Sequence, residues 1–357
     1  MSNHKQRISF PHVGNYWVPL KYLFTEGMGV DYVVPPAITK KTLDIGSQHS
    51  PDFVCTPFKY NLGNYIETIE AGANTLVQTG GVCRLGYYGE LHEQILSDLG
   101  YEVQFVNTAR ASFPRPVTMY HLFKEVNPEM TIKQIGKAIP VFLKMIEYTD
   151  ELEDYIRKNI GFEVTEGSLQ QVYQHFLLEL QQVKDKRQLK ALFTSCKKEL
   201  LQVKLNLPAT TFRVGIVGEY YTIMEPFSNH FIEKELAKMG IVVDRWMNIT
   251  NSIIRPPEKE VRKRIKPYVK YNMGATSMYT VHKALDFAKK GYDGIIHVKS
   301  FGCTPEMDAI PVLQNISEDY KIPVLYFSFD TQTSDTGIQT RLEAFYDMIV
   351  MRNEAKV

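Results

Sequence analysis

Apolar runs that indicate strands alternate with helical patterns at both ends of the 357-residue chain, and this alternation restricts the fold more than any other feature. The expected strands are Arg7–Val13, Asp31–Val34, Asp52–Val54, Asn74–Gln78 and Tyr101–Val106 in the N-terminal region, and Phe212–Gly218, Ile241–Trp246, Tyr292–Lys299 and Ile322–Phe329 in the C-terminal region. Glycine follows several of the helical patterns, as at Gly100, Gly240 and Gly291. Such alternation is typical of parallel sheets wound with helices.

The middle of the chain has a different pattern. From about residue 131 to residue 203, apolar residues recur every three or four positions among Lys, Glu, Gln and Leu, with a break near Gly161–Gly167. This period predicts two or three helices. The sequence therefore predicts an α/β fold with two Rossmann-like wound parallel-sheet domains, at residues 1–125 and 209–357, and a helical connecting segment at residues 126–208.

Composition and charge argue against several classes of protein. Lys and Arg together number 41 and Asp and Glu 40, so the net charge of +1 gives no electrostatic argument for nucleic-acid binding. The sequence has no run of about 18 apolar residues, so no membrane span is predicted. The N-terminal residues lack the apolar stretch of a signal peptide. We therefore expect a cytoplasmic protein, in which cysteines stay reduced.

Three of the four cysteines stand where predicted strands end. Cys55 and Cys303 each directly precede Thr-Pro, and Cys83 follows the strand Asn74–Gln78 through a Gly-Gly turn. In both Thr-Pro pairs we expect Thr to be the N-cap and Pro the first residue of the following helix. Each cysteine is thus predicted beside a helix N-terminus, where partial positive charge favours a thiolate.

Ligands of wound sheets bind outside the carboxyl ends of the strands, so these three thiols are expected in a cleft between the domains. Zinc usually takes four ligands in closely spaced pairs, which this sequence lacks. Three thiolates without an obvious fourth favour a cubane iron–sulfur cluster with one iron open. The alternative is that the cysteines only pack in the core. Cys196 lies in a Lys-rich helical segment and is expected to be structural.

Other polar residues are open to two interpretations. Glu219 follows a predicted strand, where it would either line the cleft or cap a helix. His297 lies within a strand and is expected to be a core residue rather than a ligand. Asp330, Asp335 and Arg341 are expected to order the last loop and helix rather than to catalyse a reaction.

Three motifs resemble those of the 2-hydroxyacyl-CoA dehydratase component family: Gly80–Arg84 (Gly-Gly-Val-Cys-Arg), Ser300–Pro305 (Ser-Phe-Gly-Cys-Thr-Pro) and the C-terminal Asp330–Phe345. The family includes the subunits of 2-hydroxyglutaryl-CoA dehydratase and benzoyl-CoA reductase and extends to the double-cubane cluster proteins. The sequence is most similar to the standalone CoA-substrate enzyme activase-related proteins, and the resemblance covers nearly the whole chain.

The resemblance implies a [4Fe-4S] cluster held by Cys55, Cys83 and Cys303 between two Rossmann-like domains. It also implies an acyl-CoA-type substrate, an anaerobic setting and an ATP-hydrolysing activator, itself an iron–sulfur protein, that injects one low-potential electron. In the dehydratases a ketyl radical then acidifies the β-proton, the 2-hydroxyl group leaves and the electron is recycled. The implied activity is that of a lyase or of a reductase component, in a homodimer or in a heterodimer with a related subunit. The chain has no complete P-loop and no G-x-G-x-x-G motif, which is consistent with a separate ATPase.

Two other functions stay open at the level of sequence. The chain could be a non-catalytic electron-transfer or activase-associated cluster protein, including a relative of the double-cubane reductases. It could also be a two-domain binding protein without a cluster. No residue that recognises the adenine or pyrophosphate of CoA can be identified, so the substrate is not fixed by the sequence.

Overall fold

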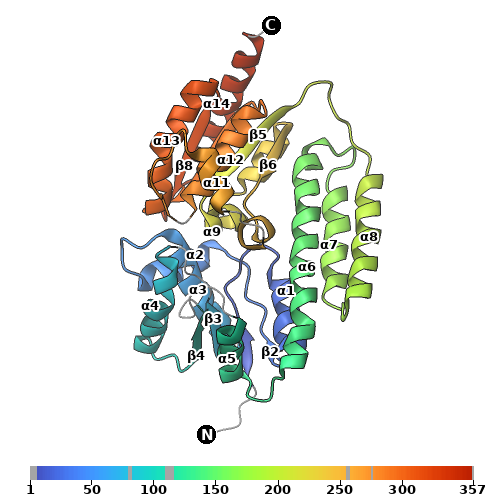
Figure 1. Ribbon diagram of the computed structural model, residues 1–357, viewed down its shortest axis with the longest axis vertical. Coiled ribbons are helices and arrows are strands. Elements are labelled where there is room, and N and C mark those ends of the chain that lie inside the picture. The colour runs from blue at the N-terminus through green and yellow to red at the C-terminus, as the bar shows by residue number, and fades with distance from the viewer. Residues whose placement is uncertain (1–5, 79–82, 109–115, 255–257, 275, 356–357) are drawn as a thin grey trace. The chain divides into compact units, whose positions relative to one another are not determined.

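The computed structural model describes residues 6–78, 83–108, 116–254, 258–274 and 276–355. Its two four-stranded sheets contain only parallel strand pairs, which confirms the predicted fold class. The strand orders are β2-β1-β3-β4 and β6-β5-β7-β8, so the two sheets are wound in the same order (Figure 1). The strands are β1 (Arg7–Ser9), β2 (Asp31–Tyr32), β3 (Thr75–Gln78), β4 (Gln104–Asn107), β5 (Phe212–Gly218), β6 (Ile241–Arg245), β7 (Gly294–Ser300) and β8 (Val324–Phe329).

The chain packs as two compact units. Unit 1 comprises Met1–Tyr148 and Phe176–Phe193, and unit 2 comprises Thr149–His175 and Thr194–Val357. The boundaries between the units fall within three helices, α6 (Ile132–Asn159), α7 (Ser168–Leu180) and α8 (Lys186–Gln202). The predicted division at residues 125/126 and 208/209 stays a prediction.

In unit 1 helices cover both faces of the sheet. The helical elements are α1 (Trp17–Tyr22), the π-helix η1 (Leu23–Gly27), α2 (Lys40–His49), α3 (Thr56–Glu70), α4 (Leu85–Asp98) and α5 (Pro116–Val126). Leu76 of β3 packs with buried side chains of α3 and α4, whereas its neighbour Val77 packs with those of η1 and α5. The two faces follow from the period of two along a strand.

One predicted strand of this unit, Asp52–Val54, is wrong. These residues form a turn between α2 and α3 instead. Phe53 is 93% exposed, so the short segment has no sheet to pack against. The residues before it form α2, which begins with a capping box between Thr39 and Thr42.

Helices α2 and α3 cross at two glycines. A Cβ atom on Gly46 would lie 1.7 Å from the carbonyl oxygen of Lys59, and one on Gly63 would lie 1.9 Å from that of Thr42. Only a residue without a side chain allows the two backbones this approach. The contact sets the position of α3, which begins directly after Cys55.

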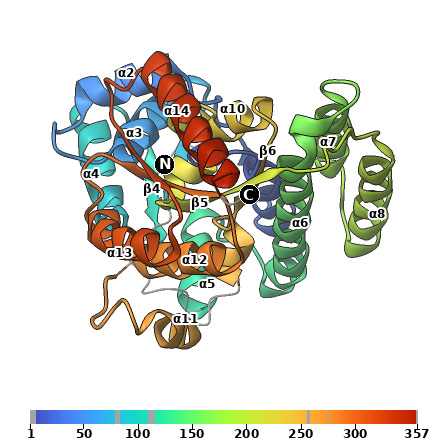
Figure 2. The same cartoon turned by 90° about the horizontal axis from the view of Figure 1, so that it is seen from above.

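In unit 2 the helices also lie on both sides of the sheet, with α12 and α13 on one side and α10 and α14 on the other (Figure 2). The strands β5 and β7 are seven residues long, and every residue of β7 is buried. The helical elements are α9 (Tyr220–Met224), the 3-10 helix η4 (Pro226–Asn229), α10 (Ile232–Lys238), the π-helix η5 (Thr250–Ile254), α11 (Glu258–Ile265), α12 (Ser277–Lys289), α13 (Thr304–Tyr320) and α14 (Asp335–Glu354).

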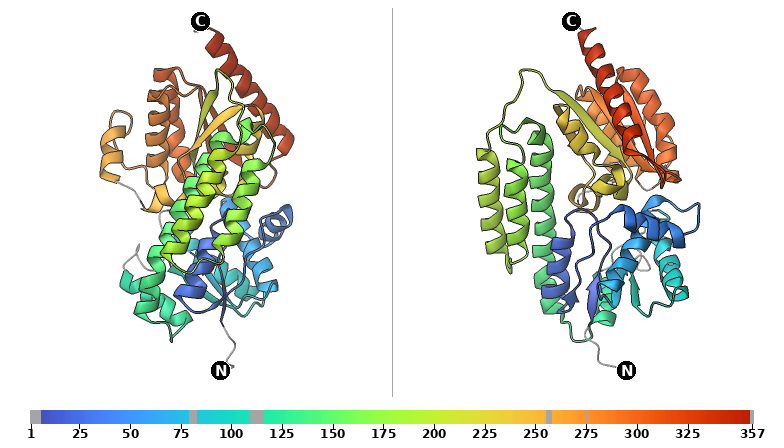
Figure 3. Two further views of the ribbon diagram at one scale, coloured as in Figure 1. Left: turned by 90° about the vertical axis from the view of Figure 1, so that its right-hand side faces the viewer. Right: turned by 180° about the vertical axis from the view of Figure 1, so that it is seen from behind.

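The three long helices α6, α7 and α8 lie side by side (Figures 1 and 3). They confirm the predicted helical segment, and the break near Gly161 is the short 3-10 helix η3 (Ile160–Phe162). The ring of Tyr148 on α6 stacks on that of Phe193 on α8, with centroids 3.7 Å apart.

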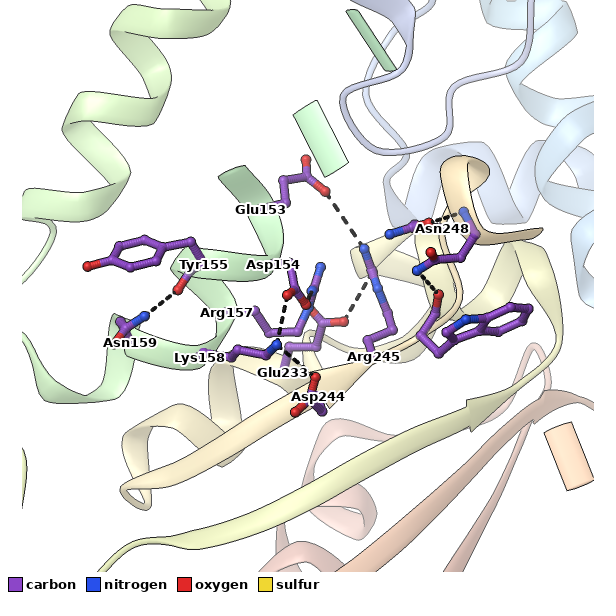
Figure 4. Close-up of polar contacts among 12 residues, drawn as sticks. Glu153, Asp154, Tyr155, Arg157, Lys158, Asn159, Glu233, Asp244, Arg245 and Asn248 are labelled. Carbon is purple, nitrogen blue, oxygen red and sulfur yellow. Dashed lines mark hydrogen bonds and ion pairs between the residues drawn. The ribbon is translucent and has the colours of Figure 1, made fainter. Parts of the chain in front are cut away.

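A network of ion pairs joins the end of α6 to α10 and β6 within unit 2 (Figure 4). The Arg157 guanidinium lies 2.9 Å from Glu233, and that of Arg245 lies 3.1 Å from the other oxygen of the same carboxylate. Although burial raises the pKa of Glu233, the two guanidinium groups outweigh it and hold that pKa below its usual value. Both arginine side chains are only 5% exposed, so the carboxylate compensates charges that would otherwise be buried without partners.

Candidate functional site

Cys55 lies in unit 1 at the start of α3. It is itself the N-cap residue, with extended backbone angles of φ −68° and ψ 154°. The expectation that Thr56 would be the N-cap is therefore wrong by one position, because Thr56 is the first helical residue and Pro57 the second. The thiol is half-buried, and its sulfur lies 3.3 Å from the hydroxyl of Tyr88 on α4.

Cys83 is exposed and stands two residues before α4. The predicted turn Gly80–Val82 that leads to it lies outside the described residues. Burial raises the pKa of Tyr88 first, and the charges of Cys55 and of Cys83 raise it further. Unit 1 therefore holds the Cys55 thiol against the Tyr88 hydroxyl, and the charge of Cys83 acts on the same group.

A buried histidine lies beside Tyr88, with ring centroids 6.3 Å apart. The ring of His92 on α4 stacks on that of Phe58, the third residue of α3, with centroids 4.0 Å apart. One ring nitrogen lies 3.1 Å from the carbonyl oxygen of Phe58 and the other 2.7 Å from Oε1 of Gln78. Burial lowers the pKa of His92 to about 3, so the ring is neutral at pH 7.

Cys303 lies in unit 2 and repeats the arrangement of Cys55. It is the N-cap of α13, followed by Thr304 as the first helical residue and Pro305 as the second, and it is half-buried. The chain reaches it from β7 through a turn in which Gly302 has φ +79°, a conformation that favours glycine. The expectation that Thr304 would be the N-cap is therefore also wrong by one position.

The third residue of α13 is a carboxylate, Glu306, which is fully buried. One of its oxygens lies 2.8 Å from Nε2 of His297 on β7. The other accepts hydrogen bonds from the hydroxyls of Thr276 and Thr280, which belong to the start of α12. His297 is thus a core residue, as predicted, and its charged partner comes from the helix that begins at Cys303.

Glu219 is the N-cap of α9 and accepts hydrogen bonds from the backbone N–H groups of Tyr221 and Thr222. Of the two roles open to it, the structure favours the cap. Burial raises the pKa of Glu219, and the nearby charge of Glu306 adds to this effect. Unit 2 therefore keeps one half-buried and one fully buried carboxyl group at the carboxyl ends of β5 and β7.

A cavity of about 540 Å³ lies beside Cys303 within unit 2. Its lining comes from the end of β7 and the turn after it, from the first turns of α13 and from β8: Lys299, Phe301, Gly302, Thr304, Met307, Ile310, Tyr326, Phe327 and Ser328. Burial lowers the pKa of Lys299, and the negative charges of Cys303 and Glu306 act in the opposite direction. The cavity therefore has one cationic group in a largely apolar lining.

Cys196 is buried in α8, as predicted for a structural residue. Burial raises the pKa of its thiol to about 12, so it stays protonated at pH 7 and is a poor metal ligand. The other three cysteines are exposed or half-buried, which suits thiolate ligands.

The C-terminal motif has structural contacts, in agreement with the expectation from sequence. Asp330 accepts hydrogen bonds from Gln332 and Thr333 in the turn before α14, and Asp335 contacts His230. The Arg341 guanidinium donates to the carbonyl oxygen of Tyr326 on β8.

The structure thus places Cys55 and Cys83 in unit 1, where the charges of both act on Tyr88, and Cys303 in unit 2. Within the described residues, no group of three or more His, Cys, Asp or Glu side chains is gathered as for a metal ion. The donor set nevertheless fits an iron–sulfur cluster, because all three thiols are accessible and two of them stand at helix N-caps that no side chain caps. In the same part of the chain, no helix is long and apolar enough to cross a membrane.

Several residues around these cysteines were not predicted from the sequence. Tyr88 and His92 are four residues apart on α4, and Lys299 follows His297 by two positions on β7. These spacings place each pair on one face of its helix or strand, and this is the sequence pattern from which they could have been predicted. Glu306 had a weaker signal, since it is only three residues after Cys303.

Comparison with known protein families gives a match over the middle and C-terminal parts of the chain. The family 2-hydroxyglutaryl-CoA dehydratase, D-component, matches residues 118–349, which is more than half of the chain. The matched region includes Cys303 and leaves out Cys55 and Cys83. No curated protein matches the chain.

Proposed function

Because the chain belongs to the 2-hydroxyglutaryl-CoA dehydratase D-component family, we propose that Cys55, Cys83 and Cys303 together hold a [4Fe-4S] cluster. The observation that carries the proposal is that the Cys55 sulfur lies 3.3 Å from the Tyr88 hydroxyl, on which the charge of Cys83 also acts. Cys303 has the same N-cap position in unit 2 that Cys55 has in unit 1. Three thiolates leave one iron of a cubane without a protein ligand.

When bound, such a cluster supplies low-potential one-electron chemistry. We propose that this chemistry acts on an acyl-CoA-type substrate, in a dehydratase-like or reductase component that receives its electron from an ATP-hydrolysing activator protein. The residues of the chain itself would orient the thiolates and limit the access of water. The helix N-termini behind Cys55 and Cys303 favour the thiolate form, because their first-turn N–H groups carry partial positive charge.

The cluster proposal is tested by iron and sulfide analysis of anaerobically purified protein. Wild type should contain about four irons per chain, as one cubane requires. Cys55→Ala, Cys83→Ala and Cys303→Ala should each lose most of the iron, because the cluster would be left with two thiolates. Cys196→Ala is the matched control, since this thiol is buried and protonated. Wild-type iron content in any of the first three variants would refute the proposal.

A second experiment separates the enzyme from the electron carrier. Reduced protein with an activator ATPase is offered a panel of 2-hydroxyacyl-CoA compounds, and formation of the unsaturated acyl-CoA is followed. Turnover of any of them supports the enzyme. Complete absence of turnover, with full reduction of the cluster, would instead assign an electron-transfer role.

A further inference from the structure

The cavity beside Cys303 is formed by one face of two neighbouring strands and by the helix that covers them. In the parallel pairing of β7 with β8, His297 lies opposite Tyr326 and Lys299 lies opposite Ser328. Paired residues of neighbouring strands point to the same face of the sheet, and so do residues two positions apart on one strand. The contact between His297 and Glu306 shows that α13 covers this face. The cavity is therefore closed on one side by the helix that begins at Cys303.

Lys299 is the unusual member of the lining. The residue is only 5% exposed, and its ammonium group donates one hydrogen bond, of 2.9 Å, to the hydroxyl of Ser328. An ammonium group has three donors. Among the residues that the structure describes, Ser328 is its only hydrogen-bond partner, and no carboxylate forms an ion pair with it. The charges of Cys303 and Glu306 act on this ammonium group, but its remaining donors are costly to bury unless a ligand accepts from them.

The rest of the lining indicates what such a ligand would look like. Phe301, Met307, Ile310 and Phe327 offer apolar walls, and Phe301 and Met307 are 64% and 51% exposed in the described structure. The hydroxyl of Tyr326 is buried and has no hydrogen-bond partner in the described part of the chain. One cation among apolar walls matches a singly charged group on a short hydrocarbon chain. A phosphate carries more charge than a single ammonium balances.

We propose that this cavity binds a carboxylate carried by a short apolar chain, with Lys299 as the residue that binds the carboxylate. Two sources share this chemistry: a free carboxylic acid, and the far end of a dicarboxylic acyl thioester. In the second case Lys299 sets the specificity for the acyl group, and that reading rests on the proposed function. The first case is independent of it.

The test compares ligands that differ only in the charged end. Binding to the full-length chain is measured by calorimetry with hexanoate against hexanamide, and with adipoyl-CoA against hexanoyl-CoA. The carboxylate of at least one pair should bind about tenfold or more tightly, as expected for a hydrogen-bonded charge pair. Preference within the first pair alone indicates a free acid, and preference within the second indicates the acyl thioester. Equal binding within both pairs would overturn the proposal.

Variants then assign the effect to Lys299. Lys299→Met should abolish the preference for the carboxylate, whereas Lys270→Met, at an exposed lysine outside the lining, should leave it unchanged. A preference that persists in a folded Lys299→Met protein contradicts the assignment. If that variant does not fold, Met307→Trp at the half-exposed rim should block binding of both members of each pair, and unchanged binding would exclude the cavity.

Iron analysis of the same samples separates this inference from the cluster proposal. Protein that lacks iron but prefers the carboxylate refutes the cluster and leaves the binding site in place. Protein with about four irons and no preference for the carboxylate refutes the binding site and leaves the cluster proposal in place.

Discussion

The two Cys-Thr-Pro segments are built alike but have opposite surroundings. In both, the cysteine is the N-cap and the third helical residue is fully buried beside a histidine. In unit 1 that third residue is Phe58, whose ring stacks on His92. In unit 2 it is Glu306, whose carboxylate contacts His297 and two threonine hydroxyls.

The difference shows that the same Cys-Thr-Pro helix start can be stabilised by two kinds of contact. The start of α3 is stabilised by the stacking of Phe58 on His92. The start of α13 is stabilised by the hydrogen bonds of the Glu306 carboxylate. The charges of Glu306 and Cys303 both act on Lys299, whereas the ring of His92 is neutral. We therefore expect the two sites to respond differently to substitution and to pH.

Each unit contains one of the two tryptophans, which allows separate measurement of unfolding. Trp17 belongs to unit 1 and Trp246 to unit 2. Fluorescence of a Trp246→Phe protein reports on unit 1, and that of a Trp17→Phe protein reports on unit 2. The following free energies of unfolding refer to these backgrounds.

The largest change in the free energy of unfolding is expected when Phe58 of unit 1 is replaced by glutamate, the residue at the equivalent position of unit 2. Phe58→Glu buries a carboxylate without the two threonine donors that Glu306 has, and should cost about 5 kcal/mol or more in unit 1. Phe58→Leu keeps an apolar residue there and should cost about 1 kcal/mol. Urea unfolding followed through Trp17 measures both. Similar costs for the two variants would show that Phe58 is not enclosed as the packing indicates.

Removal of the unit 2 carboxylate should have the next largest effect. Glu306→Ala leaves His297, Thr276 and Thr280 without their shared partner, and should destabilise unit 2 by about 3–5 kcal/mol. Unfolding followed through Trp246 measures it. Glu343→Ala on the exposed side of α14 is the control and should change stability little. A loss as small as the control's would mean that the buried network is not coupled to folding.

The smallest of the three effects is a dependence of unit 1 on pH. The pKa of His92 is about 3 when folded and near 6.5 when unfolded, so below pH 6.5 only the unfolded chain takes up the proton. Stability should fall as the pH drops below 6.5, by about 2 kcal/mol at pH 5. Urea unfolding of wild type and His92→Gln at pH 8 and pH 5 isolates this term. An equal pH dependence in both proteins would rule out His92 as its source.

Much of the fold follows from local sequence pattern, and the exceptions have physical causes. Phe212–Gly218 was predicted as a strand and is β5, because a long apolar run specifies a central strand of a buried sheet. Arg7–Val13 was predicted as one strand, but only Arg7–Ser9 pairs. The ends of short strands depend on their neighbours, which a local pattern does not contain.

The site was predicted only in part for the same reason. The positions of Cys55 and Cys303 at helix starts follow from Thr-Pro, which is a local signal. The surroundings of the thiols arise from contacts between distant residues, such as Lys299 with Ser328 or Thr276 with Glu306. Period and spacing identify the face on which a residue lies but not its partner on another element.

The orientation of the Cys55 thiol depends on the glycine crossing of α2 and α3, because Cys55 directly precedes α3. Gly46 and Gly63 leave no space for a side chain between the two backbones, so the close packing of α3 on α2 depends on both. A single methyl group at this crossing would force the two backbones apart, and we expect the contact between the Cys55 sulfur and Tyr88 to lengthen while every thiol remains present. Such a variant would show whether the proposed cluster requires only the presence of the Cys55 sulfur or also its orientation.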